Sequence, residues 1–176
     1  MAPEYIFRLA QEDDYRDIVS IFVRAIDKMN SQAIYQWDKI YPTKDILKAD
    51  IDKRQMYVLT LNKIIVSAVV INEEQDPQYG SANWKFENGK IAVMHRLCVN
   101  PDYQNKGIGK ITINFVEKML VERGYEALRL DTFSQNHFAL ALYKKSGYSY
   151  VGDVTFRKGL FHLFEKSLNH HDKDIG

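Results

Sequence analysis

Seven residues in the middle of the chain combine glycine with positive charge in a way that suits phosphate binding. Gln104–Lys110 reads Gln-Asn-Lys-Gly-Ile-Gly-Lys and gives the pattern Q-x-x-G-x-G. Gly107 and Gly109 have no side chain, so phosphate oxygens can approach the backbone closely, and Lys106 and Lys110 add charge nearby. The segment therefore suits a pyrophosphate, although a glycine-rich helix start without a ligand shows the same pattern.

The elements around this segment decide how it can work. Ile91–Val99 is an apolar run typical of a strand, and Asn100-Pro101 marks a turn after it. Apolar residues after the glycines recur at helical spacing and end before Gly124. A helix that begins here offers unpaired N–H groups and the positive end of its dipole. Neither G-x-x-x-x-G-K-[ST] nor G-x-G-x-x-G occurs, so two other nucleotide-binding patterns are excluded.

A second motif lies downstream and makes the first one more specific. Asn136 to Tyr148 follows the pattern N-x-x-A-x-x-L-Y-x-x-x-G-[FY]. Together with Leu97–Lys110, it resembles the acetyl-CoA-binding motifs of the GNAT superfamily of acetyltransferases. The resemblance is strong over Ile91–Gly152, and before that it concerns only the order of elements.

The resemblance implies both a fold and a reaction. The fold is α/β (α+β), with three layers, a mixed central sheet with a splayed parallel strand pair, and helices on both faces. The reaction is direct transfer of acetyl from acetyl-CoA to a primary amine of a small molecule, and no metal is expected. Two other functions stay open, which are acetylation of a protein lysine or N-terminus and non-catalytic sensing of acyl-CoA.

For the cofactor, the resemblance points to three groups of residues. The backbone of the strand before the loop pairs with pantetheine, the loop amides hold the pyrophosphate with Gln104 bracing the loop, and Asn136 matches a position that often contacts the cofactor arm. The expected cofactor-binding residues are Leu97, Cys98, Val99, Gln104, Asn105, Lys106, Gly107, Ile108, Gly109, Lys110, Asn136 and Tyr143.

For the chemistry, the resemblance places Tyr143 near the thioester sulfur. Its hydroxyl can give a proton to the leaving thiolate, and the alternative is a plain core aromatic. A backbone N–H, expected at Leu97, would polarise the carbonyl oxygen. His95 is the first candidate base, because its ordinary pKa is suitable and alternation places it on one face with Leu97 and Val99. Asp131 is the second candidate base, and water is the third.

Each of these polar residues also has a structural interpretation. His95 can pack beside Arg96, and Asp131 can pair with Arg96 or Arg129. Cys98 is expected to be a small buried residue rather than a nucleophile, since direct transfer needs none.

The resemblance implies an acceptor site built by the first two helices and the late hairpin, and the aromatic residues there are candidates for it. Such rings can bind an apolar or cationic acceptor, or they can cover the open end of the core. The polar stretch Asn72–Lys90 either shapes this site or is a tolerated insertion. The substrate candidates are Tyr35, Trp37, Trp84 and Asp131, with Tyr41 and Phe156 in the same regions.

Periodicity along the chain predicts the order β-α-α-β-β-β-α-β-α-β-β. The strand–loop–helix–strand centre predicts two parallel strands, and the flanks predict antiparallel hairpins, one of them turning at Asn62-Lys63. The expected strands are Tyr5–Leu9, Met56–Leu61, Ile64–Ile71, Ile91–Val99, Ala127–Phe133, Tyr148–Phe156 and Leu160–Lys166. The expected helices are Glu12–Met29, one capped by Thr43, one from the glycine loop through Arg123, and Asn136–Lys145.

Length and composition limit the class of protein. The 176 residues predict one domain, residues 1–168, followed by a frayed polar tail, residues 169–176. The formal net charge of +1 argues against a nucleic acid or membrane partner. The single cysteine needs no oxidising compartment, and the start of the chain has no apolar run of signal-peptide type, so a cytoplasmic protein is expected. Homodimer formation through the late strands stays open.

Overall fold

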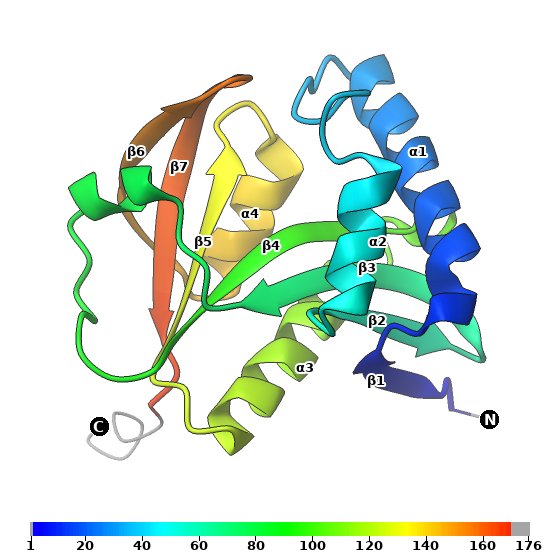
Figure 1. Cartoon of the computed structure of the whole chain (residues 1–176), viewed down its shortest axis with the longest axis horizontal. Coiled ribbons are helices and arrows are strands. Elements are labelled where there is room, and N and C mark those ends of the chain that lie inside the picture. The colour runs from blue at the N-terminus through cyan, green and yellow to red at the C-terminus, as the bar shows by residue number, and fades with distance from the viewer. Residues whose placement is uncertain (1, 170–176) are drawn as a thin grey trace. The chain divides into compact units, whose positions relative to one another are not determined.

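Within residues 2–169, which the computed structural model describes, seven strands form a mixed sheet in the order β1-β2-β3-β4-β5-β7-β6 (Figure 1). The strands are β1 (Tyr5–Leu9), β2 (Met56–Leu61), β3 (Ile64–Asn72), β4 (Ile91–Val99), β5 (Ala127–Phe133), β6 (Ser149–Phe156) and β7 (Gly159–Ser167). The helices are α1 (Tyr15–Ser31), α2 (Lys44–Asp52), α3 (Ile108–Glu122) and α4 (His137–Lys145). Short 3₁₀ turns are η1 (Glu12–Asp14), η2 (Pro77–Ser81) and η3 (Pro101–Tyr103).

The predicted α/β class and the order of the elements are confirmed. β4 and β5 run parallel, with Ile91, Ala92 and Val93 opposite Ala127, Leu128 and Arg129. The pairs β1–β2, β2–β3, β5–β7 and β6–β7 are antiparallel. A parallel pair needs a crossover, and here α3 supplies it.

The chain divides into two compact units, and each is described by itself. The first contains the residues up to Ile71 together with His95–Thr112, and the second contains Asn72–Met94 together with the described residues from Ile113 onward. The single domain expected over residues 1–168 stays a prediction. Of the tail expected at residues 169–176, residues 170–176 lie outside the described part of the chain.

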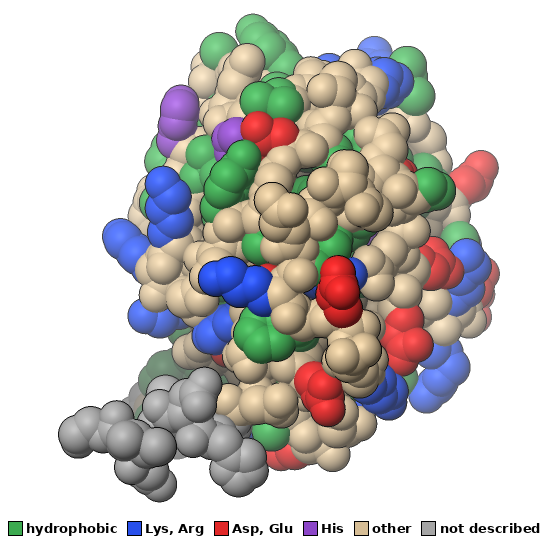
Figure 2. Space-filling model, turned by 90° about the vertical axis from the view of Figure 1, so that its left-hand side faces the viewer, with side chains coloured by type: hydrophobic (Ala, Val, Ile, Leu, Met, Phe, Trp, Pro, Cys, Tyr) green, Lys and Arg blue, Asp and Glu red, His purple; other side chains and the backbone are tan. Residues whose placement is uncertain are grey.

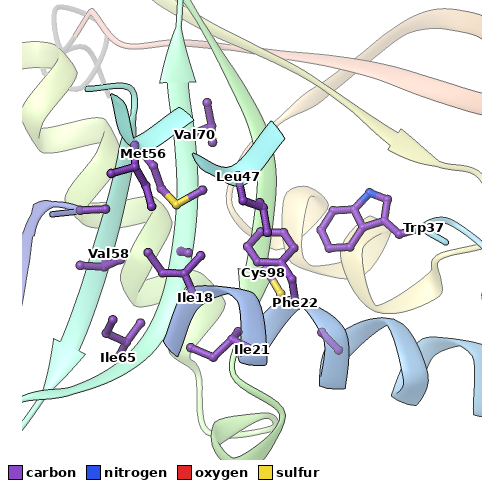
Figure 3. Close-up of a cluster of buried hydrophobic side chains, with 14 residues drawn as sticks. Ile18, Ile21, Phe22, Trp37, Leu47, Met56, Val58, Ile65, Val70 and Cys98 are labelled. Atoms are coloured by element: carbon purple, nitrogen blue, oxygen red, sulfur yellow. The ribbon is translucent and has the colours of Figure 1, made fainter. Parts of the chain in front are cut away.

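The first unit has a hydrophobic core between the first two helices and one face of the sheet. Ile18 and Phe22 of α1 and Leu47 of α2 pack with Met56 and other apolar side chains of β2 and β3 (Figure 3). Each fully buried side chain of this size contributes about 1.5–3 kcal/mol. Ile18 and Phe22 are four residues apart, so they lie on one face of α1.

Local signals fix where the elements of the first unit begin and turn. The Thr43 hydroxyl accepts a hydrogen bond from the Ile46 N–H at 3.2 Å, which confirms the predicted cap of α2. Asn62 and Lys63 have φ angles of 49° and 71°, the left-handed values that a tight two-residue hairpin turn needs.

The other face of β3 carries the first turn of α3. The Ser67 and Thr112 hydroxyls are 2.6 Å apart, and both residues are fully buried. The Thr112 hydroxyl donates to the Ile108 carbonyl oxygen at 2.7 Å, so its own proton is used and Ser67 must be the donor to Thr112. This chain of hydrogen bonds fixes the start of α3 on the sheet.

The second unit also has two differently covered faces. On one, Tyr143 of α4 packs against Phe164 of β7, and Glu117 of α3 pairs with Lys166 at 2.9 Å. On the other, the segment 73–90 crosses in front of β6 and β7 (Figure 1), and the Lys85 N–H donates to Glu165 at 2.7 Å. Alternation along β7 separates these contacts, because Phe164 and Glu165 point to opposite faces.

A buried ion pair joins α2 to β4 in the first unit. Arg96 Nε and Nη2 donate to the two carboxylate oxygens of Asp50 at 2.8 Å and 2.7 Å. Burial acts to lower the pKa of Arg96, but the hydrogen bond to Asp50 and the neighbouring charges outweigh it and raise the pKa. The guanidinium therefore stays charged and depends on Asp50 as its partner.

We predict that Asp50→Ala lowers the free energy of unfolding by about 3 kcal/mol, because it leaves a buried guanidinium without its counter-ion. Asp52→Ala is the matched control on the same helix. It breaks the Lys48–Asp52 pair, where the aspartate side chain is 58% exposed, and little change is expected. Urea unfolding followed by circular dichroism measures both, and equal small losses would contradict the importance of the buried pair.

Candidate functional site

The end of β4 is set by one buried amide side chain. Asn100 Nδ2 donates to the Ile65 carbonyl oxygen at 3.0 Å, and the Asn100 N–H donates to the Val66 carbonyl oxygen at 2.8 Å. Its Oδ1 accepts from the Asp102 N–H at 3.0 Å. The chain leaves the sheet here at a fixed angle, and the glycine loop follows directly.

Two cation contacts hold the residues at the base of the loop. Arg24 of α1 pairs with Asp102 at 3.1 Å and donates to Asn100 Oδ1 at 3.4 Å. The Lys106 ammonium lies 5.2 Å from the centre of the Tyr103 ring. Positive charge is thus held beside the start of α3.

The loop needs glycine at position 107 because of the backbone conformation there, and not because a side chain would clash. Gly107 has a φ of 76°, and a Cβ placed on it would meet no heavy atom within 4 Å. The Ile111 N–H donates to the Gly107 carbonyl oxygen at 3.1 Å, so the helix begins directly after Gly107. Ile108 is buried and anchors the first turn.

These features fit a pyrophosphate. The approach to the backbone at Gly107 is open, the first N–H groups of α3 follow it, and the exposed Lys106 and Lys110 flank it. Among the predicted loop residues, Asn105 takes a left-handed φ of 60°, Gln104 is half-buried and Gly109 lies in the first helical turn.

A left-handed residue interrupts β4 where the sequence predicted regular alternation. Arg96 has a φ of 49°, so the strand is locally irregular at this point. Arg96 reaches Asp50, and Cys98 lies in the core with α1 and α2, so both face the helices (Figure 3). Leu97 and Val99 alternate with them. His95 precedes the interruption, so its predicted position on one face with Leu97 and Val99 stays a prediction.

Cys98 is a core residue, as predicted from its position in the strand. Its side chain is buried, and burial raises the pKa of its thiol far above the ordinary value. A neutral buried thiol is a poor nucleophile, which agrees with transfer that uses no cysteine.

In the second unit, Tyr143 is buried in an aromatic cluster. Its ring lies 5.8 Å from that of Tyr148 and 6.2 Å from that of Phe164. Burial raises the pKa of the Tyr143 hydroxyl, and the charge of Asp131 raises it further. The hydroxyl therefore keeps its proton at neutral pH, as a proton donor must. The ring of Tyr143 is a core aromatic, and this is compatible with a hydroxyl that donates a proton.

Asn136 has a structural role that the sequence pattern did not assign. It is the cap of α4, and its Oδ1 accepts from the Ala139 N–H at 3.1 Å. Contact with the cofactor arm stays a prediction for this residue.

Asp131 has a different partner from those considered in the sequence. The Tyr79 hydroxyl donates to Asp131 Oδ2. Arg96 binds Asp50 instead, and Arg129 donates to Gln75 Oε1 and to the Phe86 carbonyl oxygen, both at 2.7 Å.

The structure separates the predicted acceptor aromatics into different environments. Trp37 is only 7% exposed and packs against Phe22 in the core, so the structural interpretation describes its ring. A contact between Trp37 and the substrate stays a prediction. Tyr35 is 53% exposed. Trp84 is half-buried, and its Nε1–H donates to the Tyr79 carbonyl oxygen at 2.7 Å.

The remaining two aromatic residues have local partners. The Tyr41 hydroxyl accepts from Arg96 Nη1 at 2.6 Å, and the Phe156 ring lies 5.2 Å from that of Phe161. Tyr41 is therefore part of the Asp50–Arg96 cluster, and Phe156 is part of the β6–β7 hairpin.

Sequence reasoning missed Tyr79 and the Asp50–Arg96 pair. Tyr79 lies in a polar stretch without periodicity, and the only local signal is Asp76-Pro77, where Asp76 accepts from the Gln78 N–H at 2.9 Å and begins η2. Asp50 is an acidic residue within a short helix, and nothing local indicates that it is buried.

The surface and the described side chains add few further sites. On the face drawn in Figure 2, acidic and basic side chains are interspersed, with hydrophobic side chains between them. Among residues 2–169, no group of histidine, cysteine or acidic residues is arranged to hold a metal ion. None of the helices in that range combines the length and the apolar character that a membrane span requires.

Comparison with known proteins places the chain in a family. Residues 21–148 match the model of the Acetyltransferase (GNAT) family. The chain is 22% identical to YesJ, an uncharacterised N-acetyltransferase of Bacillus subtilis, over 89% of this chain and 86% of that one.

Solved structures share the fold. A GNAT-family acetyltransferase from Streptococcus agalactiae has a TM-score of 0.81 at 18% identity, covering 93% of this chain and 95% of that one. The structure of yncA from Salmonella typhimurium, which contains its cofactor acetyl-CoA, has a TM-score of 0.69 at 17% identity, covering 96% of each chain. With more than half of its length matched by the family model, the chain belongs to the acetyltransferase (GNAT) family.

Proposed function

We propose that this protein is an N-acetyltransferase that moves acetyl directly from acetyl-CoA to a primary amine of a small molecule. The observation that carries the proposal is the loop before α3, where Gly107 takes a left-handed φ of 76° and leaves its outer side open. Family membership and the acetyl-CoA in a structural relative support the choice of donor.

The loop residues would hold the donor by its pyrophosphate. The amides from Lys106 to Lys110 would donate to the phosphate oxygens, and the lysine side chains would neutralise their charge. The backbone of Leu97, Cys98 and Val99 would pair with pantetheine. Cys98 itself contributes only backbone there, since its side chain lies in the core.

Tyr143 would act as the acid in the transfer. The acceptor loses one proton to water, and its nitrogen forms the new C–N bond as the C–S bond breaks. Tyr143 gives its proton to the leaving sulfur and receives the second proton from the nitrogen, so it ends the cycle protonated. A leaving thiolate with a pKa near about 8.5 benefits from such a donor.

The base in this reaction would be His95 or water. His95 is half-buried next to the left-handed Arg96, and an imidazole is a side chain that can take up a proton at neutral pH. Water can take the same proton. Screening primary amines with detection of the released thiol tests the activity, and binding of acetyl-CoA without turnover of any amine would favour the sensor function instead.

We predict that Gly107→Glu weakens acetyl-CoA binding more than about 100-fold, because it fills the open approach and adds negative charge beside the phosphates. Gly124→Glu is a matched control just past the other end of α3. Gly124 has a φ of 80°, and its added Cβ also meets nothing within 4 Å, so both variants carry similar backbone strain. Titration calorimetry distinguishes them, and equal affinities would refute the loop assignment.

We predict that Tyr143→Phe keeps acetyl-CoA affinity within about threefold and slows turnover about 100-fold, because only the proton donor is lost. The control is Tyr148→Phe, which removes a second buried hydroxyl, one that donates to Glu117 at 3.0 Å. That variant should lose about 1 kcal/mol of stability and retain its turnover. Steady-state kinetics with the best amine of the screen measures both rates.

If Tyr143→Phe and Tyr148→Phe slow turnover equally, the effect belongs to packing of the aromatic cluster and the acid assignment is wrong. The pH profile adds a second criterion. Because burial raises the pKa of Tyr143, its hydroxyl stays protonated through neutral and mildly alkaline pH. Wild-type turnover should therefore not fall in this pH range through ionisation of Tyr143. A fall that is present in wild type and absent in Tyr143→Phe would contradict this.

A further inference from the structure

A tyrosine–carboxylate pair in the second unit is placed to receive the acceptor. We propose that the Asp131 carboxylate binds the acceptor as an ammonium ion and that the Tyr79 hydroxyl positions this carboxylate and keeps it charged. The inference rests on the proposed function and adds to it a substrate class, namely amines that arrive as cations.

Tyr79 is buried, yet its hydroxyl donates a hydrogen bond to a side chain that is only half-buried, that of Asp131. Tyr79 is 2% exposed, while Asp131 is half-buried and so remains within reach of a ligand. A buried phenol hydroxyl requires a partner, and here the partner is the Asp131 Oδ2. A buried hydroxyl from the segment 73–90 is therefore hydrogen-bonded to an accessible carboxylate on β5.

The segment that carries Tyr79 is fastened on both sides of it. Arg129 donates to Gln75 before Tyr79 and to the Phe86 carbonyl oxygen after it, both at 2.7 Å. The Lys85 N–H donates to Glu165, which stands opposite Arg129 in the sheet. These bonds fix the Tyr79 hydroxyl before any ligand arrives, which lowers the ordering that binding requires.

Contacts within the segment add to this. The Tyr79 and Trp84 rings are 5.6 Å apart, and the Trp84 Nε1–H donates to the Tyr79 carbonyl oxygen. Trp84 also packs with the Arg129 guanidinium, whose carbon lies 4.1 Å from a Trp84 ring centre. Trp84, a predicted substrate residue, thus has a supporting role in this arrangement.

The hydrogen bond also decides between two roles for Asp131. A donor to a carboxylate favours its charged form and makes it a weaker base. An amine has a pKa of roughly 10.4 and arrives protonated, so a carboxylate whose charged form is favoured suits ammonium binding better than proton removal. Asp131 is therefore assigned to binding, and the base stays with His95 or water.

The register of β5 places Asp131 on the face that segment 73–90 covers. Its neighbour Leu130 stands opposite Phe164, on which the Tyr143 ring packs, so Leu130 points to the Tyr143 face and Asp131 to the other. The charge of Asp131 also acts on Tyr143, after burial, to raise the pKa of that hydroxyl. An ammonium held by Asp131 would therefore lie on the face of β5 opposite the Tyr143 ring.

The test uses the full chain and two probes of nearly the same shape. Benzylamine is a cation at pH 7.5, and benzyl alcohol is its neutral counterpart. Ligand-observed NMR titration gives the affinity of each for wild type, Asp131→Asn, Tyr79→Phe and Tyr125→Phe. Tyr125→Phe is the matched control, because the Tyr125 hydroxyl donates to Glu73 at 2.7 Å and ties the same segment down without touching Asp131.

Wild type should bind benzylamine at least about tenfold more tightly than benzyl alcohol, as expected for a charge-assisted hydrogen bond. Asp131→Asn should remove that difference, Tyr79→Phe should reduce benzylamine affinity about three- to tenfold, and Tyr125→Phe should leave it unchanged. The acetyl-CoA affinity should be the same in all four proteins.

Three results would overturn the proposal: equal wild-type affinity for the two probes, an Asp131→Asn variant that still prefers benzylamine, or equal losses in Tyr79→Phe and Tyr125→Phe. Failure of the proposed function has a different signature. In that case wild type does not bind acetyl-CoA, whatever its affinity for benzylamine.

Discussion

Asn100 hydrogen-bonds in three directions at the point where β4 leaves the sheet, and the geometry of the proposed cofactor loop follows from this. A buried amide left unpaired would cost about 1–3 kcal/mol, so the chain has one favoured path at this position. A few residues later, the Ser67–Thr112–Ile108 hydrogen bonds fix the start of α3. The loop is thus held at both ends, and its left-handed turn before the helix falls to a residue without a side chain.

In the second unit, the local environment favours a protonated hydroxyl at Tyr143 and an ionised carboxylate at Asp131. Burial among aromatic rings keeps the Tyr143 hydroxyl protonated. A donated hydrogen bond from Tyr79 favours the ionised form of Asp131. In the proposed transfer, the first group would donate a proton to the leaving sulfur and the second would bind the ammonium, whose nitrogen must still lose a proton to a base before it attacks. Enzymes commonly separate the roles of titratable groups by such differences in environment.

Local patterns predicted most of the fold. The bounds of β1, β2, β4 and β5 agree with the predicted ones. Apolar residues alternate with polar ones in a half-buried strand and form a continuous run in a buried strand, and both patterns can be seen in the sequence. The position of β7 between β5 and β6 was not predicted. Either strand of a hairpin can pair with a sheet edge, and the choice depends on side-chain packing that periodicity does not encode.

The site was predicted less completely than the fold. The glycine loop and Tyr143 could be proposed from sequence because their spacing is itself the signal. Arg96, Asp50 and Tyr79 instead act through contacts with residues that are distant in sequence. Arg96 takes a left-handed conformation that its residue type does not favour, and the hydrogen bonds to Asp50 and Tyr41 hold its side chain. Tyr79 lies in the polar stretch Asn72–Lys90, where no periodicity marks a buried residue.

The central claim is that the loop before α3 binds the pyrophosphate of acetyl-CoA. Titration calorimetry of the purified protein with acetyl-CoA, and with ATP and NAD as controls, tests it most directly. Our account predicts selective, tight, one-to-one binding of acetyl-CoA and much weaker binding of either control. Absence of acetyl-CoA binding, or equal affinity for all three, would contradict it.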